Sequence, residues 1–150
     1  MATILLTTKI KTNIQACFDL ARSIDFHMES TAKTGERAIA GTTSGLIGLD
    51  ETVTWKAKHF GFTQQLTSKI TAFKPPFHFR DEQVKGIFKY IKHDHFFKVE
   101  GDHVIMRDEF RFASPLGVLG KIADALLIKR YLKSFILERN ALLKRRLENE

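Results

Sequence analysis

Polar side chains that could do chemistry recur at inward-facing positions of the predicted strands. His59 ends a run in which every second residue is apolar, and Asp108 lies between apolar residues in a similar run. Asp81 is placed in the same way, two positions after a phenylalanine. Because successive side chains of a strand point to opposite faces, these polar groups share a face with apolar residues. The alternation therefore predicts carboxylates and imidazoles inside an apolar environment.

Two further histidines, His93 and His95, are spaced so that they share one face of a strand. Aromatic residues, among them Phe96, lie on the opposite face of the same strand. A β-bulge, which shifts the alternation by one residue, would decide which of the two sets points inward.

Such a group of inward polar side chains has three interpretations. They pair with one another or with buried water, as most buried polar groups do. They orient the polar end of a bound ligand, as a few polar groups do in apolar pockets. They form a metal or acid–base site, since His-x-His on a strand can bind zinc with His59 or Asp108 as a further ligand. The spacing does not demand a metal, so we predict no metal, no cofactor and no catalytic residue. On the ligand-orienting interpretation, Asp108→Asn is expected to weaken ligand binding more than folding.

The composition is that of an ordinary globular chain with an excess of phenylalanine. Of 150 residues, 43% are hydrophobic and 27% charged, and 13 are Phe against two Tyr and one Trp. Phe supplies apolar area without a polar group, which suits a core or the lining of an apolar cavity. Cys17 is the single cysteine, so no intramolecular disulfide can form and a reducing, cytoplasmic location is predicted. The length predicts one domain over residues 1–150.

The net charge of +7 is partly concentrated at Lys144, Arg145 and Arg146. Cations at the end of a helix complement its dipole, and no nucleic-acid-binding module is recognisable. We therefore predict no nucleic-acid partner. The apolar run at residues 4–6 is too short for a signal peptide, and no stretch is long enough to span a membrane.

Alternation and turn residues predict seven strands, and helical spacing predicts two short helices after the first strand. Asn13, with Thr12, can cap the first helix, and Ser23 or Asp25 can cap the second. The predicted strands cover residues 3–11, 31–40, 52–60, 65–74, 77–85, 87–100 and 103–113, and the short helices cover residues 14–22 and 24–30.

Residues 41–50 form a glycine-rich connection between two of these strands. The connection lacks the Gly-Lys-Ser/Thr ending of a phosphate-binding loop and does not open a helix. This excludes the simplest nucleotide-binding motif, and the apolar residues of the connection are expected to cover the mouth of a cavity.

The last third of the chain predicts the longest element, a helix over about residues 118–147. Its apolar residues form two stripes on roughly opposite faces, which change over at residues 125–128. This predicts a break near Asp124 and a long straight helix after it. Arg139 lies within the second stripe. Either its stem covers the core while its head reaches water, which we favour, or its head pairs with a buried carboxylate.

An antiparallel sheet with one apolar face needs a cover, and the long helix is the only predicted element able to provide it. We therefore predict an α+β fold in which a curved seven-stranded antiparallel sheet wraps around one long C-terminal helix. Such a grip commonly leaves space between the sheet and the helix.

Three local strings carry a resemblance to a known superfamily: residues 53–61, residues 79–88 with 93–97, and residues 108–112 leading to 115–117 and 138–140. Together with the order of elements, they resemble the START-like, or SRPBCC, helix-grip superfamily, which includes birch-pollen-allergen-like and lipid-transfer domains. They look like its bacterial ligand-binding members, over essentially the whole chain. The resemblance implies a helix-grip fold with an internal apolar cavity. It says little about function, because the superfamily includes lipid carriers, hormone binders, polyketide cyclases and chaperone partners.

We predict a domain that binds an apolar or amphipathic small molecule, lipid-like or polycyclic, without transforming it, as a monomer or weak homodimer. One alternative is a cyclase- or hydrolase-like enzyme with His59, His95 and Asp108 as acid–base groups. Another is a module that binds a protein partner through residues 125–128. The predicted ligand-binding residues are Trp55, His59, Phe60, Phe79, Asp81, His95, Phe97, Met106, Asp108, Phe110 and Phe112, and the predicted gate residues are Leu46, Ile47, Leu49, Leu116, Gly117 and Gly120.

Overall fold

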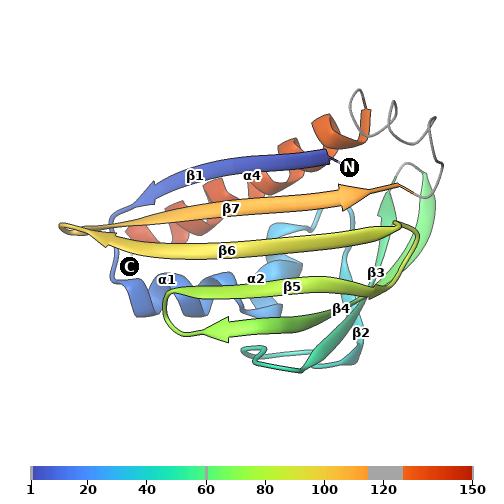
Figure 1. Cartoon of the computed structure of the whole chain (residues 1–150), viewed down its shortest axis with the longest axis horizontal. Coiled ribbons are helices and arrows are strands. Elements are labelled where there is room, and N and C mark those ends of the chain that lie inside the picture. The colour runs from blue at the N-terminus through green and yellow to red at the C-terminus, as the bar shows by residue number, and fades with distance from the viewer. Residues whose placement is uncertain (1, 60, 115–126, 150) are drawn as a thin grey trace.

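One antiparallel sheet of seven strands, in the order β1-β7-β6-β5-β4-β3-β2, organises the molecule (Figure 1). The computed structural model describes residues 2–59, 61–114 and 127–149. Two short helices follow β1, and helix α4 follows the last strand. The strands are β1 (Ala2–Ile10), β2 (Arg37–Gly41), β3 (Thr52–His59), β4 (Phe62–Lys74), β5 (His78–Lys85), β6 (Tyr90–Glu100) and β7 (His103–Ala113), and the helices are α1 (Ile14–Ala21), α2 (Ile24–Ser30) and α4 (Lys129–Glu148).

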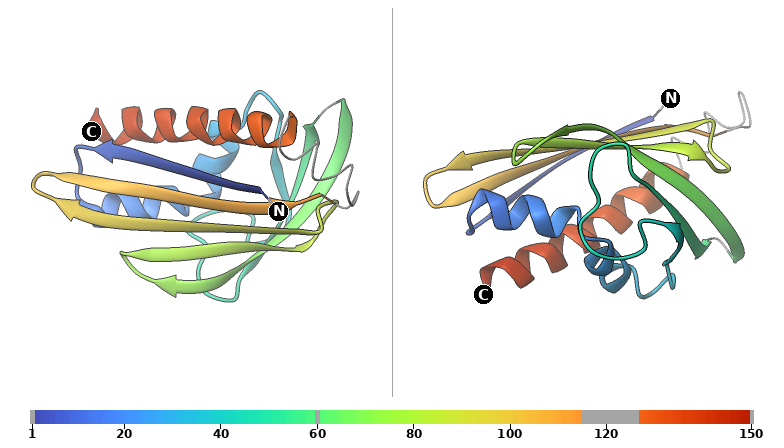
Figure 2. Two further views of the ribbon diagram at one scale, coloured as in Figure 1. Left: turned by 45° about the horizontal axis from the view of Figure 1, so that its top comes forward. Right: turned by 90° about the horizontal axis from the view of Figure 1, so that it is seen from below.

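The sheet is curved, and helices α1, α2 and α4 all lie on its concave side (Figure 2). Helix α4 runs beside β1, and its inward face buries Ile136, Leu143 and Leu147. The predicted α+β fold, with a seven-stranded antiparallel sheet and a long C-terminal helix, is confirmed. None of the helices within the described ranges is both long enough and apolar enough to cross a membrane.

The two short helices begin at the residues that the sequence indicates. The side chain of Asn13 accepts a hydrogen bond from the backbone N–H of Ala16 at 2.8 Å. The hydroxyl of Ser23 accepts one from the N–H of Phe26 at 3.1 Å. Both bonds satisfy donors that the first turn of a helix leaves unpaired.

The predicted strand over residues 31–40 is much shorter in the structure, where β2 begins only at Arg37. Thr31 ends α2 instead: its backbone N–H and its hydroxyl both donate to the carbonyl oxygen of His27. A turn follows, in which Gly35 has a φ of +64°, a conformation that favours glycine. The polar composition of this segment therefore reflects a turn followed by the edge strand β2.

Strand β4 departs from the predicted alternation near its end. Ser68 and Ile70 are buried as expected, but the pairing with β5 shifts between Ile70 and Ala72. The irregularity turns Phe73 toward the core, where its ring lies 5.6 Å from that of Phe18. Phe73, and not Ala72, therefore packs against the core.

The start of the long helix cannot be compared with its prediction. Helix α4 is described from Lys129 to Glu148, and residues 115–126 lie outside the described residues. The expected break near Asp124 and the gate residues Leu116, Gly117 and Gly120 belong to that segment, and Phe60 also lies outside the described residues.

The apolar core has two parts. In the first, beneath α1, the ring of Phe18 contacts those of Phe79 and Phe97 at 5.5 and 5.3 Å. Burial raises the pKa of the Cys17 thiol in this part to about 12. The second part gathers Ile4, Ile91, Phe110, Phe112 and Ile136. Asp108 lies on β7 between these two parts of the core.

Candidate functional site

A cavity of about 420 Å³ lies between the concave face of the sheet and helix α4. Its volume falls in the range of pockets that hold small molecules. Strands β3 to β7, helix α2 and helix α4 all contribute to its lining. The apolar lining includes Val53, Ile70 and Ile91 from the sheet, Ile24 from α2, and Leu132 and Phe135 from α4.

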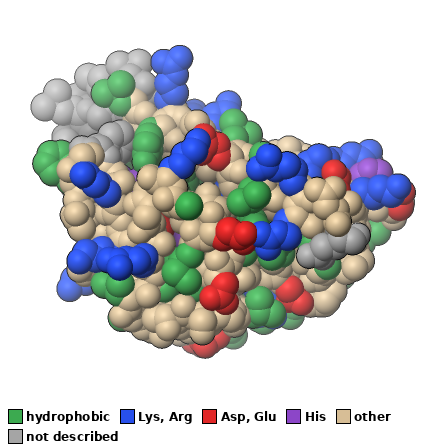
Figure 3. Space-filling model, turned by 180° about the vertical axis from the view of Figure 1, so that it is seen from behind, with side chains coloured by type: hydrophobic (Ala, Val, Ile, Leu, Met, Phe, Trp, Pro, Cys, Tyr) green, Lys and Arg blue, Asp and Glu red, His purple; other side chains and the backbone are tan. Residues whose placement is uncertain are grey.

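The outer surface is less distinctive than the cavity. On the face opposite to that of Figure 1, basic and acidic side chains are interspersed and hydrophobic side chains form small separate groups (Figure 3). The net charge of +7 is therefore not gathered into one patch on this face.

The residues predicted to bind a ligand fall into two groups. Trp55, His59, Phe79, Asp81, His95 and Phe110 line the cavity, and so does the predicted gate residue Ile47. Phe97 and Met106 lie in the core beneath α1, Phe112 lies in the second part of the core, and Asp108 is fully buried behind the cavity wall. Leu46 and Leu49 are exposed and do not line the cavity.

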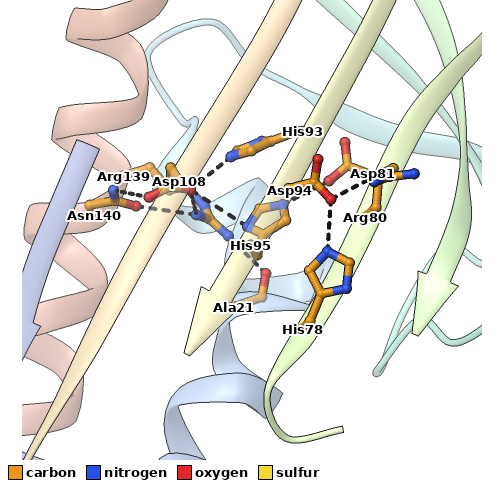
Figure 4. Close-up of polar contacts among 10 residues, drawn as sticks. All are labelled: Ala21, His78, Arg80, Asp81, His93, Asp94, His95, Asp108, Arg139 and Asn140. Carbon is orange, nitrogen blue, oxygen red and sulfur yellow. Dashed lines mark hydrogen bonds and ion pairs between the residues drawn. The ribbon is translucent and has the colours of Figure 1, made fainter. Parts of the chain in front are cut away.

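Six polar residues form an inner cluster at the cavity wall: Asp81, His93, His95, Asp108, Arg139 and Asn140 (Figure 4). Of these, Asp81, His93, His95 and Arg139 line the cavity. Asp108 is the centre of the cluster. Its Oδ1 accepts a hydrogen bond from Nε2 of His93 at 2.7 Å, and its Oδ2 accepts one from Nδ2 of Asn140 at 2.8 Å. A strand and a helix that are distant in sequence are therefore joined through one buried carboxylate.

The two histidines of the inner cluster lie on the concave face and stack with a ring separation of 3.8 Å. Nε2 of His95 is 2.8 Å from Oδ2 of Asp81. Its Nδ1 is buried, has no hydrogen-bond partner among the described residues, and lies 3.6 Å from Oδ1 of Asp108. The strand alternation thus continues through β6 without the bulge that would have turned His93 and His95 outward.

The protonation states of the inner cluster follow from its contacts. Burial alone would raise the pKa of Asp108, but the hydrogen bond and positive charge of His93 hold it well below its usual range. Burial would likewise raise the pKa of Asp81, but the hydrogen bond from His95 and the charges of its neighbours lower it. Burial lowers the pKa of His95 to about 4, so this ring is neutral at neutral pH. With Nε2–H donated to Asp81, Nδ1 of His95 is left as an acceptor.

Arg139 corrects the interpretation that we favoured from sequence, because its head does not reach water. The residue is only 6% exposed, and Nη2 donates to the carbonyl oxygen of Ala21 at 2.8 Å. Nη1 donates to Oδ1 of Asn140 at 3.2 Å and lies 4.0 Å from Oδ1 of Asp108. The alternative, a guanidinium beside a buried carboxylate, describes the structure better.

A second polar group, the side cluster of His27, Glu36, His59 and Tyr131, also lines the cavity. Glu36 is 9% exposed, and its Oε1 lies 3.0 Å from Nε2 of His27. Nδ1 of His59 is 2.6 Å from the hydroxyl of Tyr131. Sequence reasoning found only His59. Tyr131 lies within the residues predicted as the long helix, and Glu36 lies within the predicted strand over residues 31–40, where it gave no signal of a site.

The convex face of the sheet carries a third group, the outer cluster of His78, Arg80, Asp94 and Arg111. Figure 4 draws the first three of these residues. Asp94 is fully buried beneath these side chains. Its Oδ1 accepts hydrogen bonds from Nε2 of His78 at 2.7 Å and Nε of Arg80 at 2.8 Å. Its Oδ2 accepts one from Nη2 of Arg111 at 3.1 Å.

The inner cluster also contains three candidate metal ligands. Asp81, His93 and His95 each offer a ligand atom, and these atoms lie within 4.8 Å of one another. Imidazole and carboxylate suit zinc. However, Nε2 of His95 is engaged by Asp81 and Nε2 of His93 by Asp108, so a metal bound at either atom would displace one of these hydrogen bonds.

Comparison by sequence finds no family profile that matches this chain and no curated protein similar to it. Solved structures, by contrast, match over nearly the whole chain. TTHA0849 from Thermus thermophilus has a TM-score of 0.78 at 12% identity, covering 97% of each chain. A START superfamily protein from Mycobacterium smegmatis has a TM-score of 0.73 at 10% identity, covering 98% of this chain and 97% of its own. Ginseng major latex-like protein 151 from Panax ginseng has a TM-score of 0.71 at 16% identity, covering 97% of each chain. The chain therefore has the helix-grip fold of SRPBCC and START-like proteins.

Proposed function

We propose that the protein binds an apolar or amphipathic small molecule between the sheet and helix α4 and releases it unchanged. The observation that supports this best is the cavity of about 420 Å³, whose wall is largely apolar but includes polar groups at two places. An apolar wall favours the body of such a ligand, and a few polar groups fix its orientation.

The arrangement of the histidines favours binding over acid–base catalysis by His59, His95 and Asp108. These three residues do not form one group, because His59 belongs to the side cluster. Asp108 is fully buried and does not line the cavity. His95 has a pKa of about 4 and already contacts Asp81. General acids and bases need access to the substrate and a pKa near the working pH.

Filling the cavity tests the proposal. An apolar, environment-sensitive dye is expected to bind with a stoichiometry near one and to be displaced by lipid-like or polycyclic compounds. Ala57 and Ser68 are buried and line the cavity. Ala57→Trp and Ser68→Phe should therefore abolish dye binding while circular dichroism shows that the fold persists.

Lys58→Trp is the matched control for Ala57→Trp, because Lys58 is an exposed neighbour on the same strand. This control should bind the dye like the wild-type protein. Dye binding that survives both cavity-filling changes would contradict the proposal. Native mass spectrometry of the purified protein would show whether a small molecule co-purifies with it, and would identify its mass.

A further inference from the structure

Asp81 has a carboxylate oxygen with no partner among the described residues, in a largely apolar wall. Its Oδ2 is engaged by His95, but Oδ1 has no hydrogen bond or ion pair with the described residues. The side chain is 28% accessible, whereas those of His95 and Asp108 are 3% and 0% accessible. Since Asp81 lies on the concave face of a central strand and lines the cavity, this accessible surface faces the ligand space.

The chemistry of Asp81 selects what it can bind. The hydrogen bond from His95 keeps its pKa low in spite of burial, so the group is an ionised carboxylate. An ionised carboxylate only accepts hydrogen bonds. A ligand carboxylate at this place would face two negative charges, those of Asp81 and Asp108, and be repelled. The partner must therefore donate a hydrogen bond.

The charges of the inner cluster favour a cationic donor. The cluster holds two ionised carboxylates, Asp81 and Asp108, and its positive groups, the imidazole of His93 and the guanidinium of Arg139, both lie against Asp108. His95 adds no positive charge at neutral pH. Arg139 lies close to Asp108 and hydrogen-bonds to Ala21 and Asn140, but makes no ion pair with Asp81. A buried charge is costly unless it is paired, so a positive group beside Asp81 would be stabilised.

The other carboxylate of the cavity wall, Glu36, is already engaged. Its Oε1 contacts Nε2 of His27 at 3.0 Å, and its Oε2 accepts a hydrogen bond from the hydroxyl of Thr34 at 3.4 Å. Nε2 of His59 lies 3.8 Å from the same Oε2. Asp81 is thus the carboxylate of the described cavity lining that retains an unengaged oxygen.

We propose that the ligand is an amphipathic amine, whose protonated nitrogen donates a hydrogen bond to Oδ1 of Asp81 while its apolar body fills the cavity. The inference rests on the proposed function, since it identifies the polar group of the same ligand. It sets an alkyl or polycyclic amine apart from a fatty acid of equal size.

Three probes that share one alkyl chain test the proposal: decylamine, decanol and decanoic acid. Each is measured at about pH 7 by displacement of the apolar dye from the wild-type protein. Decylamine is expected to bind at least about tenfold more tightly than decanoic acid, with decanol between them, as the strength of hydrogen bonds to charged groups implies. This comparison needs no variant and so does not depend on how a variant folds.

Asp81→Asn keeps the shape and removes the charge. It should weaken decylamine binding by about tenfold or more and change decanol binding by less than about threefold. The matched control is Glu82→Gln, which removes a carboxylate charge from the next residue of β5, where Glu82 lies 3.9 Å from Lys92 and outside the cavity lining. The control should leave all three affinities unchanged.

The outcomes separate the two levels of the proposal. Equal affinity for the amine and the acid, or an Asp81→Asn variant that binds decylamine like the wild type, would overturn the amine assignment and leave the cavity proposal standing. Failure of the dye and of all three probes to bind would overturn both. Stoichiometric zinc uptake by the wild-type protein that is lost in Asp81→Asn would also overturn the amine assignment, because the free oxygen would then serve a metal.

Discussion

Two fully buried aspartates on neighbouring strands, Asp94 of β6 and Asp108 of β7, are stabilised in different ways on the two faces of one sheet. On the convex face, Asp94 receives donors from His78, Arg80 and Arg111. The two arginine side chains remain 32% and 38% exposed, so both are partly open to solvent. The convex carboxylate is thus covered by long side chains that the solvent can reach.

On the concave face, Asp108 depends on partners that are themselves buried. His93 and Asn140 donate to its two oxygens, and the guanidinium of Arg139 lies 4.0 Å away. Unused hydrogen-bonding capacity remains beside it, on Oδ1 of Asp81 and Nδ1 of His95. On the convex face both oxygens of Asp94 are engaged, and the buried atom left without a hydrogen bond is a donor, Nε of Arg111. The concave face instead leaves an acceptor, Oδ1 of Asp81, turned toward the cavity.

The largest expected effect is that of Asp108→Asn. The change leaves a buried imidazole and a buried guanidinium without their carboxylate, which costs about 3–5 kcal/mol of unfolding free energy in comparable buried pairs. This reverses the order expected from sequence, because Asp108 does not line the cavity. Chemical denaturation measures the loss of unfolding free energy. A loss smaller than that of Asp94→Asn would contradict the conclusion that Asp108 depends more on its buried partners than Asp94 does.

Acid should destabilise the concave face through His95. Its folded-state pKa of about 4 lies below its ordinary value of 6.5, so the unfolded chain takes up a proton first as the pH falls. Stability is therefore full above about pH 6.5 and is lost between about pH 6.5 and 4, by up to about 3 kcal/mol. The carboxyl pKa values of Asp81 and Asp108 are lowered, which extends the loss to more acid pH.

The contribution of His95 is tested by how steeply the unfolding free energy changes with pH, and not by the unfolding free energy at a single pH. His95→Gln should flatten the slope between about pH 4 and 6.5, whereas His103→Gln, at a half-exposed histidine of the β6–β7 hairpin, should leave it intact. Thermal melts across this range measure both. A slope that survives in His95→Gln would show that other groups bind the protons.

Asp94→Asn should have a moderate effect. Asparagine retains one acceptor oxygen, and the freed arginines can turn toward water, so we expect a loss of about 1–2 kcal/mol. Denaturation under the same conditions as for Asp108→Asn gives the comparison directly. A loss above that of Asp108→Asn would mean that the outer cluster, and not the inner one, stabilises the sheet more.

The smallest effect on stability is expected for Asp81→Asn, at less than about 1 kcal/mol. Asparagine can still accept the hydrogen bond from His95, and the lost charge faced the cavity. A melting temperature close to that of the wild type would agree with this. A loss as large as that of Asp94→Asn would instead mark Asp81 as a structural residue.

Most of the fold could be predicted from local sequence patterns. Period-two alternation located the strands and placed Asp108 on the buried side, but it left open whether His93 and His95 point inward, as they do in the structure. The capping residues Asn13 and Ser23 located two helix starts. These features depend on residues close in sequence. The alternation failed at Phe73, because a bulge is set by the pairing with β5.

The site was harder to predict from the sequence than the fold, because its contacts join segments that are distant in the chain. Whether Arg139 reaches water depends on Asp108 and Ala21, which lie on other elements. Glu36 becomes part of the cavity wall only because β2 pairs with β3 and brings it near His59. A local sequence pattern contains no information about such long-range contacts.

The pairing of β1 with β7 has a consequence for how the molecule is made in the cell. Strand β1, from Ala2 to Ile10, is synthesised before the other strands of this sheet and has its partners between Val104 and Phe112. At 5–20 residues per second, translation takes roughly 5–20 s to reach those partners. Until then β1 has no neighbour in the sheet, and the cavity, whose wall includes β7 and α4, has not formed. Ligand capture therefore cannot begin before β7 and α4 have been synthesised, and such non-local pairing is typical of slow-folding domains.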